Sequence, residues 1–257
     1  MAHWTDTRPA HQQIAALLRD RIMSGRLAPG VQLPSTQQLM AEFDVVGTTV
    51  QKALQVLKAE GLAVGRPGKG VFVRAQPHHS IVPAAYMPPS RTGEPYAWMP
   101  EAAARSMTGA SRILEVAELQ PPRDIAQALE LPADKRAVLR RRLLLLDEEP
   151  AELVHSYYPA DLAVGTRLTD RRRIRGGSPT LLTELGYPPR RFVDRISVRP
   201  PTTEEVLALE LPAEVCVLRT ARVVYSDADR PIEVSVMVKA GHLYELEYGM
   251  RVGPGGP

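Results

Sequence analysis

Residues 33–57 read LPSTQQLMAEFDVVGTTVQKALQVL and hold two helical patterns that are separated by a short turn. Ser35 and Gln38 have the spacing of a capping box, so a first helix is predicted over about 36–43. A second helix is predicted over about 48–60, because its apolar residues recur on one face while the other face is polar. Two helices in this order, the second with a polar outer face, are typical of a helix-turn-helix that binds DNA.

The flanking sequence completes this pattern into a winged helix. Residues 9–24 carry apolar side chains at helical spacing, which predicts a preceding amphipathic helix. On the other side, short β-type runs at 62–64 and 71–73 flank a glycine-rich segment, which predicts a hairpin. Three helices followed by a hairpin predict a winged helix-turn-helix domain over residues 1–76.

Composition limits the class of protein. A chain of 257 residues is long enough for two domains, and its net charge of +3 is too small to indicate a nucleic acid partner by itself. The excess of basic residues nevertheless lies within the predicted winged helix. The single cysteine, Cys216, the absence of a signal-like N-terminus and the lack of a long apolar run predict a soluble cytoplasmic protein without a membrane partner.

The remainder of the chain is organised around an internal repeat. Residues 77–100 contain six prolines and are predicted to form a semi-rigid linker. In the segment 101–252, ALELPA occurs at 128–133 and again at 208–213, and the sequences that follow the two copies stay parallel. Each copy predicts a helix, a strand, an acidic turn and a second strand, so the two copies predict one antiparallel sheet with helices on one face, an α+β domain. Residues 253–257 form a short tail.

Short motifs connect both parts of the chain to a known family. The predicted winged helix resembles the GntR family, with its motifs present as Gln13-Ile14, Leu33-Pro34-Ser35, Thr48-Thr49-Val50 and Gly68-Lys69-Gly70. The second part resembles the UTRA effector domain of the HutC subfamily, which has a chorismate-lyase-like fold, at Arg140, Arg142, Asp147 to Pro150 and Ser156-Tyr157. The resemblance implies a homodimeric DNA-binding transcription regulator, most often a repressor, whose C-terminal domain binds a small-molecule effector.

The expected DNA contacts follow from the geometry of such domains. The N-terminal residues of a recognition helix contact base edges, while basic side chains contact phosphates. We expect Thr48, Thr49 and Gln51 to face bases, and Lys52 and Lys69 to face phosphates. Alternatively, the threonines only complete the first helical turn and the lysines are merely solvated. The full expected set is His11, Ser35, Gln37, Thr48, Thr49, Gln51, Lys52, Arg66, Gly68 and Lys69.

The chain departs from the family at three of the positions that read bases. Family members usually carry arginine where this chain has Gln37, Gly47 and Gln51. Glutamine pairs bidentately with adenine rather than with guanine, and glycine has no side chain with which to read a base. We therefore expect a pseudo-palindromic operator that is richer in A·T at the glutamine positions and is bound with modest affinity.

An anion site is expected in the second domain. Arg140 and Arg142 point to one face of a strand because side chains alternate, and the repeat makes Arg222 the counterpart of Arg142. Arginines can bind a phosphate or carboxylate, and glutamates can bind hydroxyl groups. Ser178 begins a short helix, whose N-terminus could bind an anion. The effector is expected to be a small anion, such as a phosphorylated sugar or an organic acid. Alternatively, these charges pair with one another on a solvated face, and the tyrosines pack in the core. The expected set is Arg140, Arg142, Glu152, Tyr157, Ser178, Arg222, Glu233 and Tyr244.

Two other classes of function are compatible with the fold. The chorismate lyase fold itself catalyses a pyruvate-releasing elimination, so an enzyme is one alternative. The sequence shows no nucleophile with a base, no metal-ligand cluster and no phosphate loop, so we expect no catalytic residue, no metal and no cofactor. The other alternative is a constitutive architectural DNA-binding protein whose second domain serves only dimerisation.

Overall fold

The chain forms two compact units, one covering residues 1–79 and the other residues 80–257, with 212–215 grouped with the first. The computed structural model describes residues 6–74, 79–81, 98–104, 106–211, 215–241 and 243–249. The predicted boundary at residue 76 and the predicted tail 253–257 lie outside the described residues.

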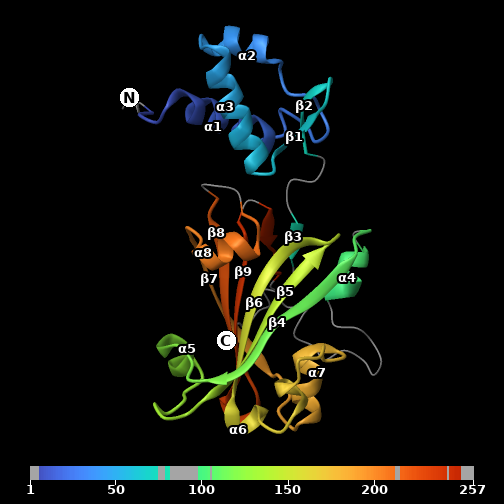
Figure 1. Ribbon diagram of the computed structural model, residues 1–257, viewed down its shortest axis with the longest axis vertical. Helices are drawn as coiled ribbons and strands as arrows, with labels where there is room; N and C mark the ends of the chain where they lie inside the picture. Colours follow the sequence, from blue (N-terminus) through green and yellow to red (C-terminus); the bar gives the residue numbers. More distant parts are fainter. Residues whose placement is uncertain are drawn as a thin grey trace, which may run out of the picture. The chain divides into compact units, whose positions relative to one another are not determined.

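The first unit is a winged helix-turn-helix, as predicted (Figure 1). Its helices and strands lie within one or two residues of the predicted ranges. The two strands pair antiparallel, from Ala63 opposite Val73 to Arg66 opposite Gly70. The elements are α1 (Ala10–Met23), α2 (Thr36–Phe43), α3 (Gly47–Ala59), β1 (Ala63–Arg66) and β2 (Gly70–Val73).

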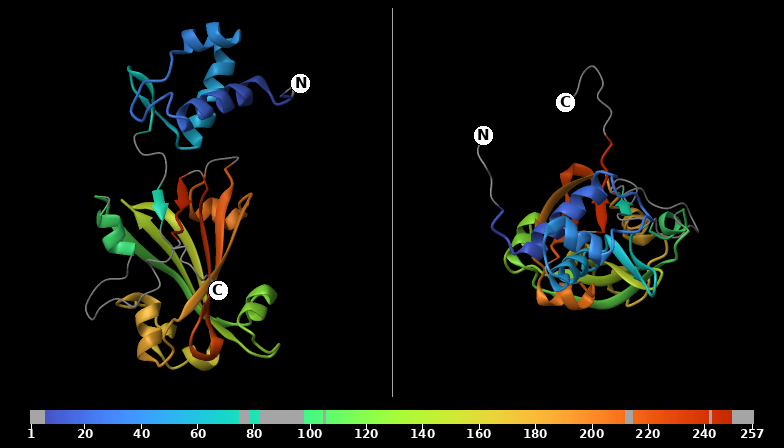
Figure 2. Two further views of the ribbon diagram at one scale, coloured as in Figure 1. Left: turned by 180° about the vertical axis from the view of Figure 1, so that it is seen from behind. Right: turned by 90° about the horizontal axis from the view of Figure 1, so that it is seen from above.

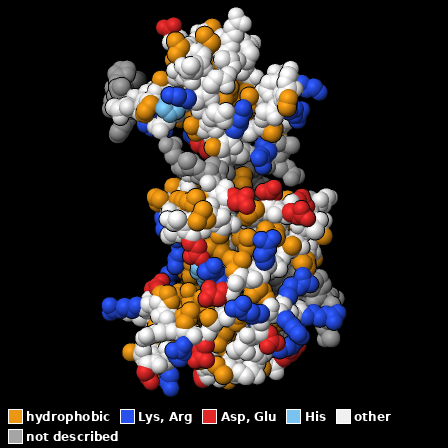
Figure 3. Space-filling view, viewed as in Figure 1, with side chains coloured by type: hydrophobic (Ala, Val, Ile, Leu, Met, Phe, Trp, Pro, Cys, Tyr) orange, Lys and Arg blue, Asp and Glu red, His pale blue; other side chains and the backbone are white. Residues whose placement is uncertain are grey.

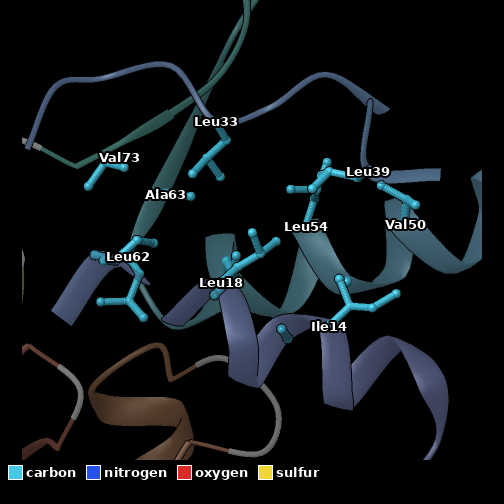
Figure 4. Packing of buried hydrophobic residues seen from close by; sticks show 13 residues of the cluster. Ile14, Leu18, Leu33, Leu39, Val50, Leu54, Leu62, Ala63 and Val73 are labelled. Carbon is cyan, nitrogen blue, oxygen red and sulfur yellow. The ribbon is translucent and has the colours of Figure 1, made fainter. Parts of the chain in front are cut away.

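Local signals and a small apolar core hold this unit together. The capping box at the start of α2 is confirmed, because the Gln38 amide donates to Ser35 Oγ at 3.2 Å and the Ser35 amide donates to Gln38 Oε1 at 2.8 Å. Gly61 has a φ of 68° and provides the left-handed stop after α3. Figure 4 shows the core between the three helices and the hairpin, with contributions from Ile14, Leu18, Leu33, Leu39, Val50, Leu54, Leu62, Ala63 and Val73.

The second unit is built on a strongly twisted six-stranded antiparallel sheet (Figures 1 and 2). The strand order is β4-β5-β6-β9-β8-β7, so the hairpins of the two repeats meet where β6 pairs with β9. Glu130 and Glu210, which are equivalent in the repeat, both have positive φ angles, of 53° and 49°. The strands are β4 (Gly109–Leu119), β5 (Ala137–Leu146), β6 (Glu149–Pro159), β7 (Arg191–Arg199), β8 (Val217–Tyr225) and β9 (Pro231–Ala240).

Helices cover both faces of this sheet, so the prediction of helices on one face only was wrong. The repeat helices α5 (Arg123–Ala128) and α8 (Thr203–Ala208) pack on one face, which we call the repeat face. The opposite face, which we call the pocket face, is covered by α4 (Trp98–Ala104), α6 (Ala160–Ala163), the 3-10 helix η2 (Arg167–Thr169) and α7 (Gly177–Glu184). The physical reason is visible in residues 143–146 of β5, which are all buried leucines and therefore need cover on both faces.

A second small sheet and helix α4 occupy part of the predicted linker. Strand β3 (His79–Ile81) pairs with β10 (Tyr244–Leu246). Helix α4 begins at Trp98, inside the predicted linker 77–100, because the Trp98 side chain is buried against apolar residues of β5 and against Tyr244. Most of the remaining linker lies outside the described residues.

Candidate DNA-reading surface and effector pocket

The outer face of α3 presents the side chains that are expected to read bases. Thr48, Gln51 and Lys52 are exposed, and Thr49 is half-buried. Val46 precedes the helix without a side-chain cap, so the first amides of α3 receive no capping oxygen from it. Gln51 is not a free side chain, because its Nε2 donates to Thr36 Oγ1 of α2 at 2.9 Å. This bond uses one of the two Nε2 hydrogens and leaves the other hydrogen and Oε1 available to a base.

The wing holds its basic residues in a defined geometry. Arg66 lies over the ring of Phe72, 4.3 Å from its centroid, and Lys69 is exposed near the tip. Gln32 Nε2 donates to the Lys69 carbonyl at 2.8 Å. A Cβ at Gly70 would lie 2.7 Å from that same Nε2, and Gly70 has a φ of 104°, so this position requires glycine. Figure 3 shows Lys and Arg side chains on this unit.

The remaining expected DNA contacts are spread over the first two helices and the wing. Gln37 is exposed on the first turn of α2, whereas the hydroxyl of Ser35 accepts the capping bond of that helix. His11 is half-buried on α1, and Gly68 lies exposed at the wing tip with a φ of 69°. Ser35 therefore has a structural role in addition to any contact with DNA.

A pocket lies on the pocket face of the second unit, between α4 and α7. It brings together three of the expected effector residues, Arg140, Arg142 and Ser178. Among the described residues, the lining contains three arginines and no carboxylate. The lining residues are Trp98, Met99, Ser111, Ile113, Arg140, Arg142, Tyr158, Arg173, Ile174, Gly177 and Ser178.

Arg140 supports the pocket wall from inside. Its guanidinium donates to the carbonyls of Leu168 at 2.8 Å, Asp170 at 2.6 Å and Arg172 at 2.9 Å. Burial lowers the pKa of the Arg140 guanidinium, which is only 3 % exposed. Both of its terminal nitrogens thus fix the backbone segment that leads from η2 to α7. Arg140 is a positioning residue for the pocket, while Arg142 and Arg173 line it from β5 and from that segment.

A row of polar side chains continues from the pocket across the sheet. Arg142 donates to Ser156 Oγ at 3.4 Å, and Ser156 Oγ lies 2.6 Å from Ser235 Oγ at the junction of the two repeats. Ser235 in turn donates to Glu233 Oε1 at 2.5 Å. Glu233 is therefore linked to the pocket through Ser156, which the sequence identified only as part of a family motif, and Ser235, which it did not identify.

Arg222, the repeat counterpart of Arg142, is engaged in a buried ion pair. Its guanidinium donates to both oxygens of Asp194, at 2.7 and 2.8 Å, and stacks over Phe192 at 4.2 Å. Register places it in the same cross-strand row as Ser156 and Ser235. Arg222 thus shares the pocket face without being one of the pocket's lining residues.

The other expected effector residues are not among those that line the pocket. Glu152 forms a buried ion pair with Lys239, with 2.6 Å between Oε1 and Nζ. Tyr244 packs in the cluster that contains Trp98, and Tyr157 packs on the repeat face with Leu139.

Tyr158 occupies the position that was expected of Tyr157. It lines the pocket, bonds to Ser178, and has a pKa raised by burial. Ser156 lies directly opposite Arg140, so it faces the same side of the sheet. Residues two apart in a strand share a face, so alternation along β6 would have selected Tyr158 rather than Tyr157. Trp98 and Arg173 carried no such signal, since both lie outside the strands.

Together, these features define a class of protein: a winged-helix DNA-binding unit joined to an α+β unit with a ligand pocket. Residues 10–73 match the model of the bacterial regulatory proteins of the gntR family, and residues 104–245 match the UTRA domain. The chain belongs to the GntR family of transcriptional regulators, in the HutC-like arrangement in which a UTRA domain follows the DNA-binding domain. UTRA domains bind small-molecule effectors.

Two curated relatives align in sequence with nearly the whole chain. The uncharacterised HTH-type transcriptional regulator SCO4628 of Streptomyces coelicolor is 27% identical over 251 residues, covering 95% of this chain and 93% of that protein. The HTH-type transcriptional regulator GgaR of Escherichia coli K12 is 25% identical over 244 residues, covering 93% and 90%. These relatives identify the chain as a DNA-binding transcriptional regulator and not an enzyme.

Solved structures share the fold. A crystal structure of a GntR-family transcriptional regulator aligns with a TM-score of 0.63 at 24% identity, covering 96% of this chain and 99% of that one. PhnF from Mycobacterium smegmatis aligns with a TM-score of 0.56 at 22% identity, covering 93% and 100%. Within the described residues, no helix combines the length and the apolar character that a membrane crossing requires.

Proposed function

We propose that this regulator is a homodimeric repressor whose affinity for a pseudo-palindromic operator is modulated by a small anionic effector. The observation that carries the effector proposal is the charge of the pocket, where three arginines and no described carboxylate line one site. Guanidinium groups bind phosphate and carboxylate bidentately, which gives both affinity and orientation. Binding to the chromosome requires that the protein act in the cytoplasm.

The pocket lining supports a ligand that has an anionic end and a larger body. Arg142, Arg173 and the Ser178 hydroxyl at the start of α7 would bind the anion. Trp98 and Tyr158 also line the pocket, but they are only 3% and 1% exposed, so the body of the ligand would contact small parts of the two rings. A phosphorylated sugar or an organic acid of similar size fits this division.

A route of side-chain packing, strand pairing and chain continuity supports coupling between the pocket and the DNA-binding unit. Trp98 lines the pocket and packs in one cluster with Tyr244, which belongs to β10. Strand β10 pairs with β3, and β3 follows the winged-helix unit closely in the chain. A ligand that moves Trp98 would therefore also shift β10 and its partner β3, the strand at which the chain enters the second unit. By linkage, operator and effector would change each other's affinity by the same factor.

The DNA side of the proposal rests on the exposed polar face of α3 and on the basic wing. With one Nε2 hydrogen bonded to Thr36, Gln51 would still have Oε1 to accept from the adenine amino group and a second Nε2 hydrogen to donate to adenine N7. Gln37 is exposed and would add adenine preference. Lys52, Arg66 and Lys69 would contact phosphates, which supply affinity without sequence preference.

The test combines ligand binding with operator binding. A thermal unfolding screen with phosphorylated sugars and organic acids should identify a stabilising anion, since a ligand at about 100 times its Kd adds roughly 2.7 kcal/mol. Arg173→Met and Ser178→Ala should abolish that gain, whereas the exposed Arg171, which does not line the pocket, should tolerate the matched Arg171→Met. The ligand should then shift the binding isotherm of the purified protein on its upstream DNA. An isotherm that stays unchanged at saturating ligand would refute the modulation.

A further inference from the structure

Helix α3 is preceded by an exposed valine, Val46. Its side chain is 65% exposed, and its backbone is extended, with a φ of −76° and a ψ of 156°. A residue in this position usually supplies a side-chain oxygen to the first amides of the helix. Val46 forms no such bond. The valine side chain therefore neither caps the helix nor packs in the core.

The neighbouring valines show that burial was available in this part of the chain. Val45 packs against the core of the first unit, and Val50 is fully buried in it. Val46 lies between them in the sequence and is nevertheless exposed to solvent. An apolar residue that gives up both a cap and burial breaks two local rules of stability, and such positions are typical of functional sites.

Val46 belongs to a small apolar surface at the start of α3. Gly47 follows it without a side chain, and a Cβ atom on Gly47 would lie 3.4 Å from Met40 Sδ of α2. Met40 is itself 37% exposed. Val46 and Met40 thus both adjoin Gly47 and leave apolar groups open to solvent. We call Met40, Val46 and Gly47 the apolar patch.

The apolar patch continues into the side chains that are expected to read bases. The methyl carbon of Thr36 lies 4.0 Å from the same Cβ position on Gly47, and Thr36 Oγ1 accepts the hydrogen bond from Gln51 Nε2 at 2.9 Å. A single residue, Thr36, thus joins the patch to Gln51. The N-terminal residues of a recognition helix approach base edges in the major groove. A duplex that offers a base to Gln51 therefore also brings its adjacent groups close to Val46.

The major groove presents one apolar group to such a surface, the C5 methyl of thymine. The other groups of its readout pattern donate or accept hydrogen bonds, which a valine side chain cannot do. We propose that Val46 contacts the C5 methyl of a thymine in each half of the operator, so that it selects T·A over C·G at that position. The inference rests on the proposed function, because it requires α3 to lie in the major groove. It adds an apolar contact to the polar contacts proposed for Gln37 and Gln51.

Removal of single methyl groups from the DNA tests the proposal on the unaltered protein. Selection from random DNA with the full chain identifies the operator, and synthetic operators then carry deoxyuridine in place of one thymidine of each half-site at a time. Deoxyuridine lacks only the C5 methyl, so every hydrogen bond of the base pair remains. At the thymine that Val46 contacts, the change should weaken binding by about four-fold per half-site, as expected for one buried methyl group. Gel shifts or fluorescence anisotropy measure this ratio.

The variant Val46→Ser locates the contact on the protein. Serine lacks both methyl groups of valine, so the variant should bind the thymidine and deoxyuridine operators with nearly equal affinity. Serine also supplies a capping oxygen, so the variant should unfold at the wild-type temperature or above it, which controls for folding. The matched control is Val164→Ser, because Val164 is a valine of the second unit with a similar exposure of 53%, and this variant should keep the four-fold ratio.

The outcomes separate this inference from the proposed function. A chain that selects an operator but binds all of its deoxyuridine versions with unchanged affinity would overturn the methyl contact and leave the regulator intact. A deoxyuridine effect that persists undiminished in Val46→Ser would overturn the assignment to Val46. A chain that selects no sequence from random DNA would remove the operator-binding proposal and this inference with it.

Discussion

Two arginines of the pocket lining, Arg140 and Arg173, should behave differently when truncated, and Arg140→Met is the informative change. The substitution removes the donors of three backbone carbonyls, those of Leu168, Asp170 and Arg172. Hydrogen bonds from a charged donor contribute about 1.5–3 kcal/mol each. Water can replace part of them once the segment loosens, so we expect a loss of about 3–5 kcal/mol in the free energy of unfolding of the second unit.

Arg173→Met provides the contrast, because Arg173 is exposed and its described bond runs only to Met99 Sδ at 3.6 Å. We expect it to change stability by less than about 0.5 kcal/mol but to abolish effector binding. Urea unfolding followed by the fluorescence of Trp98, in a Trp4→Phe background, reports on the second unit alone, since the chain has two tryptophans. If Arg140→Met unfolded at the wild-type urea concentration while still losing the ligand, Arg140 would be a ligand residue and our interpretation of it would be wrong.

Three further predictions concern the DNA-binding unit and one helix cap. Gln51→Arg should move operator preference toward guanine by about 1–3 kcal/mol per half-site. Selection from random DNA measures this, and an unchanged consensus would contradict base contact by Gln51. Gly70→Ala should weaken operator binding in gel shifts, because its Cβ would displace Gln32 from the Lys69 carbonyl; an unaltered affinity would show that the wing does not need this geometry. Burial opposes the shift, but the Arg199 guanidinium and the Thr202 amide hold the pKa of Glu205 below its usual value of 4.5. The stability that Glu205 adds is therefore present above that pH and is lost as the pH falls through the lowered pKa. Glu205→Gln should flatten this part of the stability profile, and a profile identical to wild type would refute the assignment.

The fold could be predicted because its signals are local. The capping pair Ser35 and Gln38, the stop at Gly61 and the two ALELPA copies each depend on neighbouring residues only, and the structure confirms the elements that they predicted. The covering of the sheet could not be predicted in the same way. The run of leucines in β5 has no alternation, so nothing in it distinguishes one covered face from two.

The pocket was predicted less completely, for a physical reason. The sequence identifies a guanidinium but not its partner. Arg140 is satisfied by carbonyls of a segment that lies far along the chain and has no regular pattern, and Arg222 is satisfied by Asp194 on the neighbouring strand. The partners in such pairs are far apart in the sequence and have no characteristic spacing, so the sequence does not reveal which residues will meet. The choice of Tyr157 over Tyr158 was instead a matter of parity, which the pairing of Arg140 with Ser156 decides.

The ion pair between Arg222 and Asp194 also has a consequence for stoichiometry. The two halves of the second unit share a repeat, and a symmetric ancestor of such a unit would offer two equal binding places. Here one half keeps its arginine in the pocket lining, while the other half's arginine already donates to both oxygens of a carboxylate through Nε and Nη2. The halves are no longer interchangeable, so a saturating calorimetric titration should count one effector molecule for each polypeptide.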